Sequence, residues 1–274
     1  YVYFNENGVP LPEEEAGFDI VIGNPPYVDY RLVRPLEIHG LFKTSYMSCI
    51  KNKEKYNLYV VFIEKGINLL RSGGHFAYIN PIQILSAYMA LPLRKLLLVD
   101  YTIREIVDLS IVRVFDEAAT YPILLFVDKS KPTDMSEMRI SYKTKEEEII
   151  DKKIKHNRIH QTEFAKREDK VVMIDCRQEI VDLVRKMDEN EKLHEIAELK
   201  WGTSQSGYGE VKIAKEDFEK LPEDKRDEYL PLVQTADIIR HVIAWQGEYI
   251  QRALYPEKQL EAFRSPKVVI ARNS

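Results

Sequence analysis

The sequence is poor in cysteine, with only Cys49 and Cys176 among 274 residues and no CxxC spacing. Two separated cysteines argue against a disulfide framework and against a cysteine-based zinc site, and they make a reducing cytoplasm the expected compartment. Long apolar runs are also missing, because none approaches the roughly 18 residues that a membrane-spanning helix needs. The stretch Tyr1–Glu6 has neither the basic region nor the apolar core of a signal peptide.

Several catalytic signatures are absent as well. The six histidines form no HExxH pattern, and His156 and His160 have no cysteine or third histidine near them, so no metal site is predicted. No Walker-type phosphate loop is present, and Glu64, Lys65 and Asp175 do not assemble a nuclease signature. A formal net charge of −4 argues against a purely electrostatic DNA binder, while it leaves room for a local basic cleft.

The sequence does contain the alternation of an α/β protein. With 45% hydrophobic and 31% charged residues, the chain can bury a sizeable core. Apolar runs predict buried strands, and helical spacing predicts two helices. The first helix is closed by the glycine pair at 73–74, and the second is interrupted near Pro92. This alternation is typical of a doubly wound sheet. The expected order is a strand at 18–22, a polar irregular stretch at 28–55, a helix at 56–70, a strand at 75–79, a helix at 86–99, and strands at 103–109 and 121–127.

The composition changes at Lys129. Residues 129–170 are dense in charge and poor in large apolar side chains, which predicts an edge hairpin and a linker, and a helix is expected at 181–187. The predicted parts of the chain are 1–128, 129–192 and 193–274. Several basic residues of the middle part could touch phosphate, although a solvated linker is the simpler interpretation: Lys152, Lys153, Lys155, Arg158, Lys166, Arg167 and Lys170.

The residues that point to chemistry follow the first strand. Asn24, Pro25, Pro26 and Tyr27 stand directly behind the apolar run Phe18–Gly23. An exocyclic amine of a nucleobase is a poor nucleophile, because its lone pair is delocalised into the ring. The side-chain carbonyl of Asn24 and the backbone carbonyl of Pro25 can accept its two N–H bonds and stabilise the positive charge that develops when the nitrogen attacks a methyl group. Pro26 keeps the turn rigid, and the Tyr27 ring can stack on the base.

The same tetrapeptide can also be an ordinary turn, and in isolation the two interpretations are equally good. Its position at the end of a predicted buried strand, with strand and helix elements after it, favours methyl transfer to an amine. No general base is needed before the attack, because the amine loses its proton afterwards. A base inside a duplex is out of reach, so we expect it to be flipped out.

The stretch 18–27 resembles motif IV of the amino-directed DNA methyltransferases. Residues 57–81 are similar to the adenine-specific class of type II and type IIG restriction-modification methylases, the Eco57I-like group, and residues 114–121 resemble motif VIII of that family. The resemblance implies an α/β fold: the C-terminal half of a Rossmann-like methyltransferase sheet that uses S-adenosylmethionine, followed by an α+β target-recognition region.

The resemblance also implies roles for individual residues. It makes Asn24, Pro25, Pro26 and Tyr27 catalytic, and it places Phe115 on the flipped adenine, for which simple hairpin packing is the alternative. Residues 193–274 are similar to the opening of the family's target-recognition domain. A packing role is the simpler interpretation for the two tryptophans, Trp201 and Trp245. The DNA-binding candidates are Trp201, Thr203, Ser204, Gln205, Ser206 and Tyr208.

The chain departs from the family where the cofactor should bind. The resemblance implies S-adenosylmethionine, held by a glycine-rich loop upstream of motif IV. Only Tyr1–Gly17 precede the motif, and Asn7-Gly8 followed by Glu13–Glu15 is no such loop. We therefore expect a fragment of a larger enzyme that is inactive alone. Its expected partners are double-stranded DNA and the rest of the methyltransferase, as an upstream segment or a separate chain, with no membrane.

The leading prediction is a site-specific DNA adenine-N6 methyltransferase, the modification component of a restriction-modification system. Methylases of protein glutamine or ribosomal RNA guanine share the motif, but they usually end soon after the catalytic sheet, so the extension at 193–274 counts against them. Cytosine-N4 methylases more often begin the motif with serine, so Asn24 favours adenine. A DNA-binding specificity module without chemistry of its own is the alternative from another class.

Overall fold

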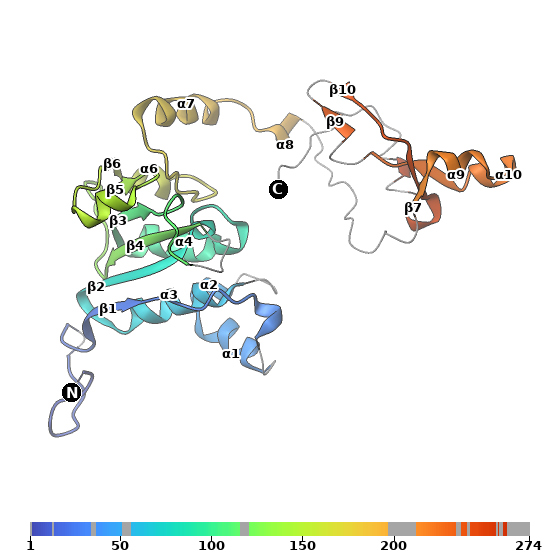
Figure 1. The fold of residues 1–274 in the computed structure, drawn as a ribbon. Coiled ribbons are helices and arrows are strands. Elements are labelled where there is room, and N and C mark those ends of the chain that lie inside the picture. The colour runs from blue at the N-terminus through green and yellow to red at the C-terminus, as the bar shows by residue number, and fades with distance from the viewer. Residues whose placement is uncertain are drawn as a thin grey trace. The chain divides into compact units, whose positions relative to one another are not determined.

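The computed structural model divides the chain into two compact units, Tyr1–Lys192 and Leu193–Ser274, and each is considered by itself (Figure 1). No helix among the described residues is long and apolar enough to cross a membrane. The structure describes residues 2–12, 14–33, 37–50, 56–115, 121–196, 212–233, 237–239, 242–255, 257 and 260–261.

A six-stranded mixed sheet organises the first unit, with the strand order β1-β2-β4-β3-β5-β6 (Figure 1). The pairs β1–β2 and β3–β5 are parallel, and the other neighbours are antiparallel. Strands β1, β2, β3 and β5 therefore point the same way, and their C-terminal ends meet at one edge of the sheet, called here the carboxyl edge. The strands are β1 (Phe18–Gly23), β2 (Leu70–Pro81), β3 (Thr102–Asp108), β4 (Pro122–Asp128), β5 (Glu137–Ser141) and β6 (Asn157–His160).

Helices α3 and α4 pack on one face of this sheet, and the core lies between. Ile63 of α3 and Leu93 of α4 share one buried cluster with Phe76 of β2 and with Ile123 and Leu125 of β4. Burial of each such side chain is worth about 1.5–3 kcal/mol. The helices of this unit are α1 (Ile38–Ser45), α2 (Met47–Ile50), α3 (Leu58–Asn68), α4 (Leu91–Asp100), α5 (Glu146–Ile150), α6 (Thr162–Ala165) and α7 (Gln178–Asp188), with 3-10 turns η1 (Tyr30–Leu32), η2 (Ile82–Leu85) and η3 (Tyr88–Ala90).

The first strand forms where the sequence predicts it, but the prediction that it is buried is wrong. Phe18, Ile20 and Ile22 are 43%, 57% and 77% exposed. These alternate residues point to one face of the sheet, whereas Val21 points to the other and packs against the core. Because β1 is the edge strand and α3 and α4 cover only the Val21 side, the opposite side of β1 is open among the described residues.

Three further local predictions need correction. Helix α3 ends at Asn68 with Leu69 as its C-cap, before the glycine pair, and Gly73 (φ +72°) lies inside β2. The second helix starts at Leu91 because Pro92 suits only a first helical turn, so the residues before it form 3-10 turns. The stretch predicted to be irregular contains α1 and α2.

Residues 129–192 lie in the first unit and not between units. Strands β5 and β6 pair as an edge hairpin of the six-stranded sheet, and α7 follows them. Four of the basic side chains of this part have internal partners: Lys153, Arg158, Arg167 and Lys170. This favours the solvated-surface interpretation over phosphate binding for such residues.

The second unit mixes short helices and strands. Its three-stranded antiparallel sheet has the order β7-β11-β8, and Phe218 stacks on Tyr249 with ring centroids 3.7 Å apart. The indole N–H of Trp245 donates to the carbonyls of Leu232 and Glu248 at 3.0 and 3.2 Å, which is a packing role. The elements are α8 (Leu193–Ile196), β7 (Lys212–Ala214), α9 (Lys215–Glu219), α10 (Glu223–Arg226), β8 (Tyr229–Pro231), β9 (Ile238–Ile239), β10 (Val242–Ile243), β11 (Glu248–Gln251) and η5 (Arg252–Leu254).

Candidate active site

The Asn-Pro-Pro-Tyr segment leaves the end of β1 at the carboxyl edge. Gly23, the last residue of the strand, lies against the ring of Tyr78 on β2, and a Cβ there would come within 2.7 Å of the Tyr78 Cε1 atom. Only glycine allows this approach without displacing the ring. The close packing fixes the direction in which the next four residues leave the sheet.

The amide and the two prolines differ in exposure. Asn24 and Pro26 are exposed, whereas Pro25 is buried. Asn24 is an exposed residue whose carboxamide forms no hydrogen bond with another described residue. Proline lacks an N–H, which leaves the Pro25 carbonyl as the only polar backbone group of that residue. The exposed Asn24 carboxamide and the backbone carbonyl of the buried Pro25 are therefore adjacent in sequence at the end of β1.

Tyr27 lies half-buried beside them and is held at both ends. Its hydroxyl donates to the carbonyl of Ile79 on β2 at 3.1 Å. Its ring makes edge-to-face contacts with Tyr59 of α3, with centroids 6.2 Å apart, and with Phe115, with centroids 6.4 Å apart. The two residues predicted to bind the base, Tyr27 and Phe115, are thus brought together by the fold although they are far apart in sequence.

Burial keeps these phenols neutral. It raises the pKa of Tyr27 to about 12 and the pKa of Tyr59 to about 12. Neither hydroxyl loses its proton near neutral pH, so both can donate hydrogen bonds and neither can serve as a general base. This agrees with a reaction in which no base is needed before nitrogen attack.

A short antiparallel contact fastens the segment after Tyr27 to the start of α3. The N–H of Leu58 donates to the Val28 carbonyl at 2.9 Å, and the N–H of Tyr30 donates to the Tyr56 carbonyl at 3.1 Å. Asn57 caps α3 by accepting the Tyr59 N–H at 3.4 Å. The sequence reasoning missed Asn57 and Tyr59, although an asparagine before an apolar helical run is a cap signal that could have found the first of them.

Asn80 is a second amide at the carboxyl edge. It is fully buried at the end of β2, and its Nδ2 donates to the Tyr78 carbonyl at 3.1 Å. Its Oδ1 is buried without a hydrogen-bond partner. An unpaired buried carbonyl costs about 1–3 kcal/mol, so Asn80 makes this edge locally less stable than an apolar residue would.

The remaining predicted residues lie elsewhere or outside the described part. The DNA-binding candidates Trp201, Thr203, Ser204, Gln205, Ser206 and Tyr208 all lie outside the described residues. No group of three or more His, Cys, Asp or Glu side chains suited to a metal ion occurs within the described ranges. A hollow of about 450 Å³ opens at the amino end of β1, around Glu14, Asp19 and Arg71, away from the carboxyl edge.

Comparison with known proteins locates the sequence similarity. The family model described as Eco57I restriction-modification methylase matches residues 3–115. The type II restriction enzyme and methyltransferase RM.Eco57I of Escherichia coli is 31% identical over 122 residues, which cover 43% of this chain and 12% of that protein. The type II methyltransferase M.TthHB8I of Thermus thermophilus is 39% identical over 77 residues, covering 26% and 17%. The matched segments therefore cover less than a fifth of the length of these two relatives.

One solved structure shares the fold over most of the chain. The type IIL restriction-modification enzyme MmeI, solved in complex with DNA, aligns with a TM-score of 0.52 and 11% identity over 91% of this chain and 31% of that one. At this identity the likeness concerns the fold alone. The predicted resemblance to the Eco57I-like type II methylases is confirmed, and residues 3–115 are the segment that carries it.

Proposed function

We propose that this chain supplies the base-binding edge of a site-specific DNA adenine-N6 methyltransferase, the modification component of a restriction-modification system. The observation that supports this best is the arrangement at the carboxyl edge. An exposed Asn24 carboxamide, which forms no hydrogen bond with another described residue, precedes Tyr27 by three positions; the Tyr27 hydroxyl donates to the Ile79 carbonyl, and its ring contacts Phe115.

The proposed chemistry needs acceptors rather than a base. The Asn24 Oδ1 and the Pro25 carbonyl accept the two N–H bonds of the flipped adenine amine, which draws its lone pair out of conjugation. The same two oxygens stabilise the positive charge that grows on the nitrogen as it attacks. The ring of Tyr27 holds the base by stacking, and Phe115 borders it. The amine proton leaves to solvent after transfer.

S-adenosylmethionine would supply the electrophilic methyl group. The described residues fit only the part of the site that binds the base to be methylated. Gly8 (φ +75°) belongs to a tight turn closed by the Phe4–Pro10 bridge, and no helix follows it, so it does not form a phosphate- or nucleoside-binding glycine loop. We therefore assign most cofactor contacts to other parts of the parent enzyme.

The open side of β1 is where those other parts would dock. Phe18, Ile20 and Ile22 form a contiguous apolar stripe on an unpaired edge strand, a surface that proteins usually cover. The matched segments cover only 12% and 17% of two curated relatives, and both relatives are longer than this chain. We propose that a further strand and helix of the methyltransferase, as an upstream segment or a separate chain, cover this stripe, and that residues 193–274 begin the DNA-recognition region.

The test is methyl transfer by the full-length parent, measured with radiolabelled cofactor on duplex DNA, ribosomal RNA and protein. Asn24→Ala should lower DNA methylation about 100- to 1,000-fold, because one charge-stabilising acceptor is lost. Tyr27→Ala should lower it by a similar factor, and both variants should keep duplex binding. Asn68→Ala is the matched control, because this exposed asparagine ends α3 just before β2 begins, at the edge of the sheet opposite the site.

The other substrates decide between the alternatives. If label appears in ribosomal RNA or protein but not in DNA, then the RNA amine or the protein amide is the substrate, and the proposal of DNA is wrong. If the parent binds a specific duplex but transfers no label to any substrate, the alternative of a DNA-binding module without chemistry of its own is correct. Normal turnover by Asn24→Ala would remove the acceptor role from this residue.

A further inference from the structure

Tyr59 is a buried residue that contacts the ring proposed to stack on the base. It lies on the first turn of α3, and its ring meets that of Tyr27 edge to face, with centroids 6.2 Å apart and planes at 89°. Tyr59 is 3% exposed and belongs to the same buried cluster as Phe76 and Leu93. A side chain this deep does not meet a nucleotide directly, so any effect that it has on the reaction passes through Tyr27.

The hydrogen bond at the tip of Tyr27 leaves the plane of its ring undetermined. The Cβ atom, the ring axis and the hydroxyl oxygen lie on one line, so the ring can turn about that line while the hydroxyl keeps its bond to the Ile79 carbonyl. The side-chain torsion that governs this turn has only broad preferences. Contacts at the sides of the ring must therefore fix its plane, and a base that stacks on the ring takes its own plane from it.

Two rings border Tyr27 nearly at right angles, and they differ in how firmly they are held. Phe115 is half-buried in the loop after β3, and under the proposed function it also borders the base. Tyr59 lies in the core, where side chains are close-packed in single rotamer minima. A core residue can hold a reference plane before the base enters, so Tyr59 is the better candidate for this role.

The backbone of Tyr59 is also tied to the segment that carries Tyr27. The N–H of Leu58 donates to the Val28 carbonyl at 2.9 Å, which joins the residue directly before Tyr59 to the residue directly after Tyr27. An antiparallel bridge extends this contact by one residue on each side. The backbone therefore keeps the two rings in register, in addition to their own packing.

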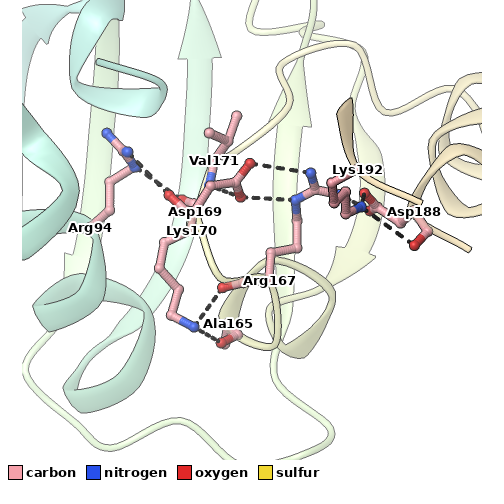
Figure 2. Close-up of polar contacts among 8 residues, drawn as sticks. All are labelled: Arg94, Ala165, Arg167, Asp169, Lys170, Val171, Asp188 and Lys192. Carbon is pink, nitrogen blue, oxygen red and sulfur yellow. Dashed lines mark hydrogen bonds and ion pairs between the residues drawn. The ribbon is translucent and has the colours of Figure 1, made fainter. Parts of the chain in front are cut away.

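A buried cation acts on the hydroxyl of Tyr59. Burial raises the pKa of Tyr59 to about 12, and the Arg94 guanidinium partly opposes that rise, so the two groups interact electrostatically. Arg94 is itself fixed, because it donates to the carbonyls of Ile84 and Ala87 at 3.0 and 2.7 Å and also reaches the Asp169–Lys170 segment (Figure 2). Tyr59 is thus held at its backbone and at its hydroxyl by parts of the first unit that are themselves fixed.

We infer that Tyr59 is a positioning residue of the candidate active site: it fixes the ring plane of Tyr27, and through that ring the plane in which the base offers its amino group to the acceptors. The inference rests on the proposed function for the identity of the base. It assigns to Tyr59 no contact with the substrate. The expected consequence of losing the Tyr59 ring is a slower chemical step, because a base that is bound but tilted presents its amine badly.

Three variants of the parent enzyme separate this role from ordinary core packing. Tyr59→Leu keeps an apolar side chain but removes the ring, so kcat for duplex methylation should fall about 10- to 100-fold with little change in the KM for DNA. Tyr59→Phe keeps the ring and should rescue kcat. Phe164→Leu is the matched control, because Phe164 is 1% exposed in the same cluster but comes from α6. It should lose a similar free energy of unfolding in urea titration and leave kcat unchanged.

A double-mutant cycle with Tyr27→Ala decides whether Tyr59 acts through Tyr27. If it does, Tyr59→Leu should change the methylation rate little in the Tyr27→Ala background, because the ring that it orients is gone. The same fold-loss in both backgrounds would mean that Tyr59 only stabilises the fold, and it would overturn the inference.

A duplex with 2-aminopurine at the target position gives a readout that needs no methyl transfer. The fluorescence rise on binding should be smaller for Tyr59→Leu than for wild type, because the base stacks less well on Tyr27, whereas Phe164→Leu should match the wild type. Such a difference in a parent that methylates no DNA would support the positioning role and remove the proposed reaction. If Tyr59→Leu equals Phe164→Leu in both fluorescence and kcat, the inference is wrong, even where DNA methylation is normal.

Discussion

At the residue scale, Tyr27 carries both the geometry and the pH behaviour of the candidate site. Desolvation raises its pKa from 10.0 to about 12. Because the raised value belongs to the folded state, the stabilising contribution of the neutral phenol is fully present below pH 10 and is lost as the pH rises through about 12. Ionisation of Tyr27 is therefore not expected to limit methylation at ordinary pH.

Tyr27→Phe in the parent separates the ring from the hydroxyl. The ring contacts with Tyr59 and Phe115 remain, while the hydrogen bond to the Ile79 carbonyl is lost. One such bond is worth about 1 kcal/mol, so methylation should fall by roughly fivefold, far less than in Tyr27→Ala. The pH–rate profiles of Tyr27→Phe and wild type should have the same shape between about pH 6 and about pH 10. An alkaline limb that disappears in Tyr27→Phe would show that the phenol ionises during turnover.

Gly23 offers a second residue-scale prediction, on stability. A methyl group at Gly23 would approach Tyr78 Cε1 to 2.7 Å, and Gly66 blocks the ring from the other side, since a Cβ there would be 2.8 Å from the Tyr78 hydroxyl. Gly23→Ala should therefore lower the free energy of unfolding by about 1–3 kcal/mol in urea titration. Gly40→Ala is the control, because no atom lies within 4 Å of its added Cβ and alanine favours helix α1. Equal effects at the two positions would contradict the packing argument.

At the element scale, Arg94 binds two loops to helix α4. It is 3% exposed, and its guanidinium donates to the carbonyls of Ile84 at 3.0 Å, Ala87 at 2.7 Å, Asp169 at 3.2 Å and Lys170 at 3.0 Å. Figure 2 shows the side chain reaching the Asp169–Lys170 segment. The turns after β2 and the segment before α7 therefore share one buried cation, in addition to the hydrogen bond that the Val172 N–H donates to the Leu85 carbonyl at 3.0 Å.

Arg94→Met keeps the apolar stem and removes the donors. Four carbonyls, one of them in a fully buried contact, then lose a donor, so the free energy of unfolding should fall by about 3 kcal/mol in chemical denaturation of the parent or of this chain. Limited proteolysis should cut first within 165–172, where two of the carbonyls are released. Lys95→Met, exposed on the same helix, should change neither measurement. A loss confined to about 0.5 kcal/mol would mean that water replaces the guanidinium without cost.

The sequence predicts the positions of strands and helices better than it predicts which neighbours cover them. Apolar runs located β1 to β4 and helical spacing located α3, because those signals are local. The exposure of Ile20 depends on which neighbours cover it, and the C-terminal end of α3 depends on β2 taking up Gly73, so neither can be read from a short window. At the site, Asn24–Tyr27 and Phe115 are predictable from motif and resemblance. The hydrogen bond from the Tyr27 hydroxyl to the Ile79 carbonyl and the one from the Lys143 N–H to the Asp108 carboxylate form only when strands pair.

At the scale of the whole molecule, the two faces of the first unit differ. One face carries α3, α4 and the core, whereas the stripe of Phe18, Ile20 and Ile22 stands open. Each exposed large apolar side chain forgoes about 1.5–3 kcal/mol that burial would give. A surface of this kind on an edge strand promotes association, either with the proposed remainder of the methyltransferase or with another copy when that remainder is absent.

Ile22→Lys distinguishes these partners from an inert surface. In the 274-residue chain, sedimentation velocity should show less self-association than wild type, because a charge replaces a side chain that is 77% exposed. In the parent, the same substitution would bury a lysine under the docked elements, so the unfolding midpoint should fall by several degrees. Ile150→Lys, at a residue that is 71% exposed on α5, should change neither property. If Ile22→Lys matches Ile150→Lys in both proteins, nothing docks on β1, and the rest of the enzyme must join this chain elsewhere.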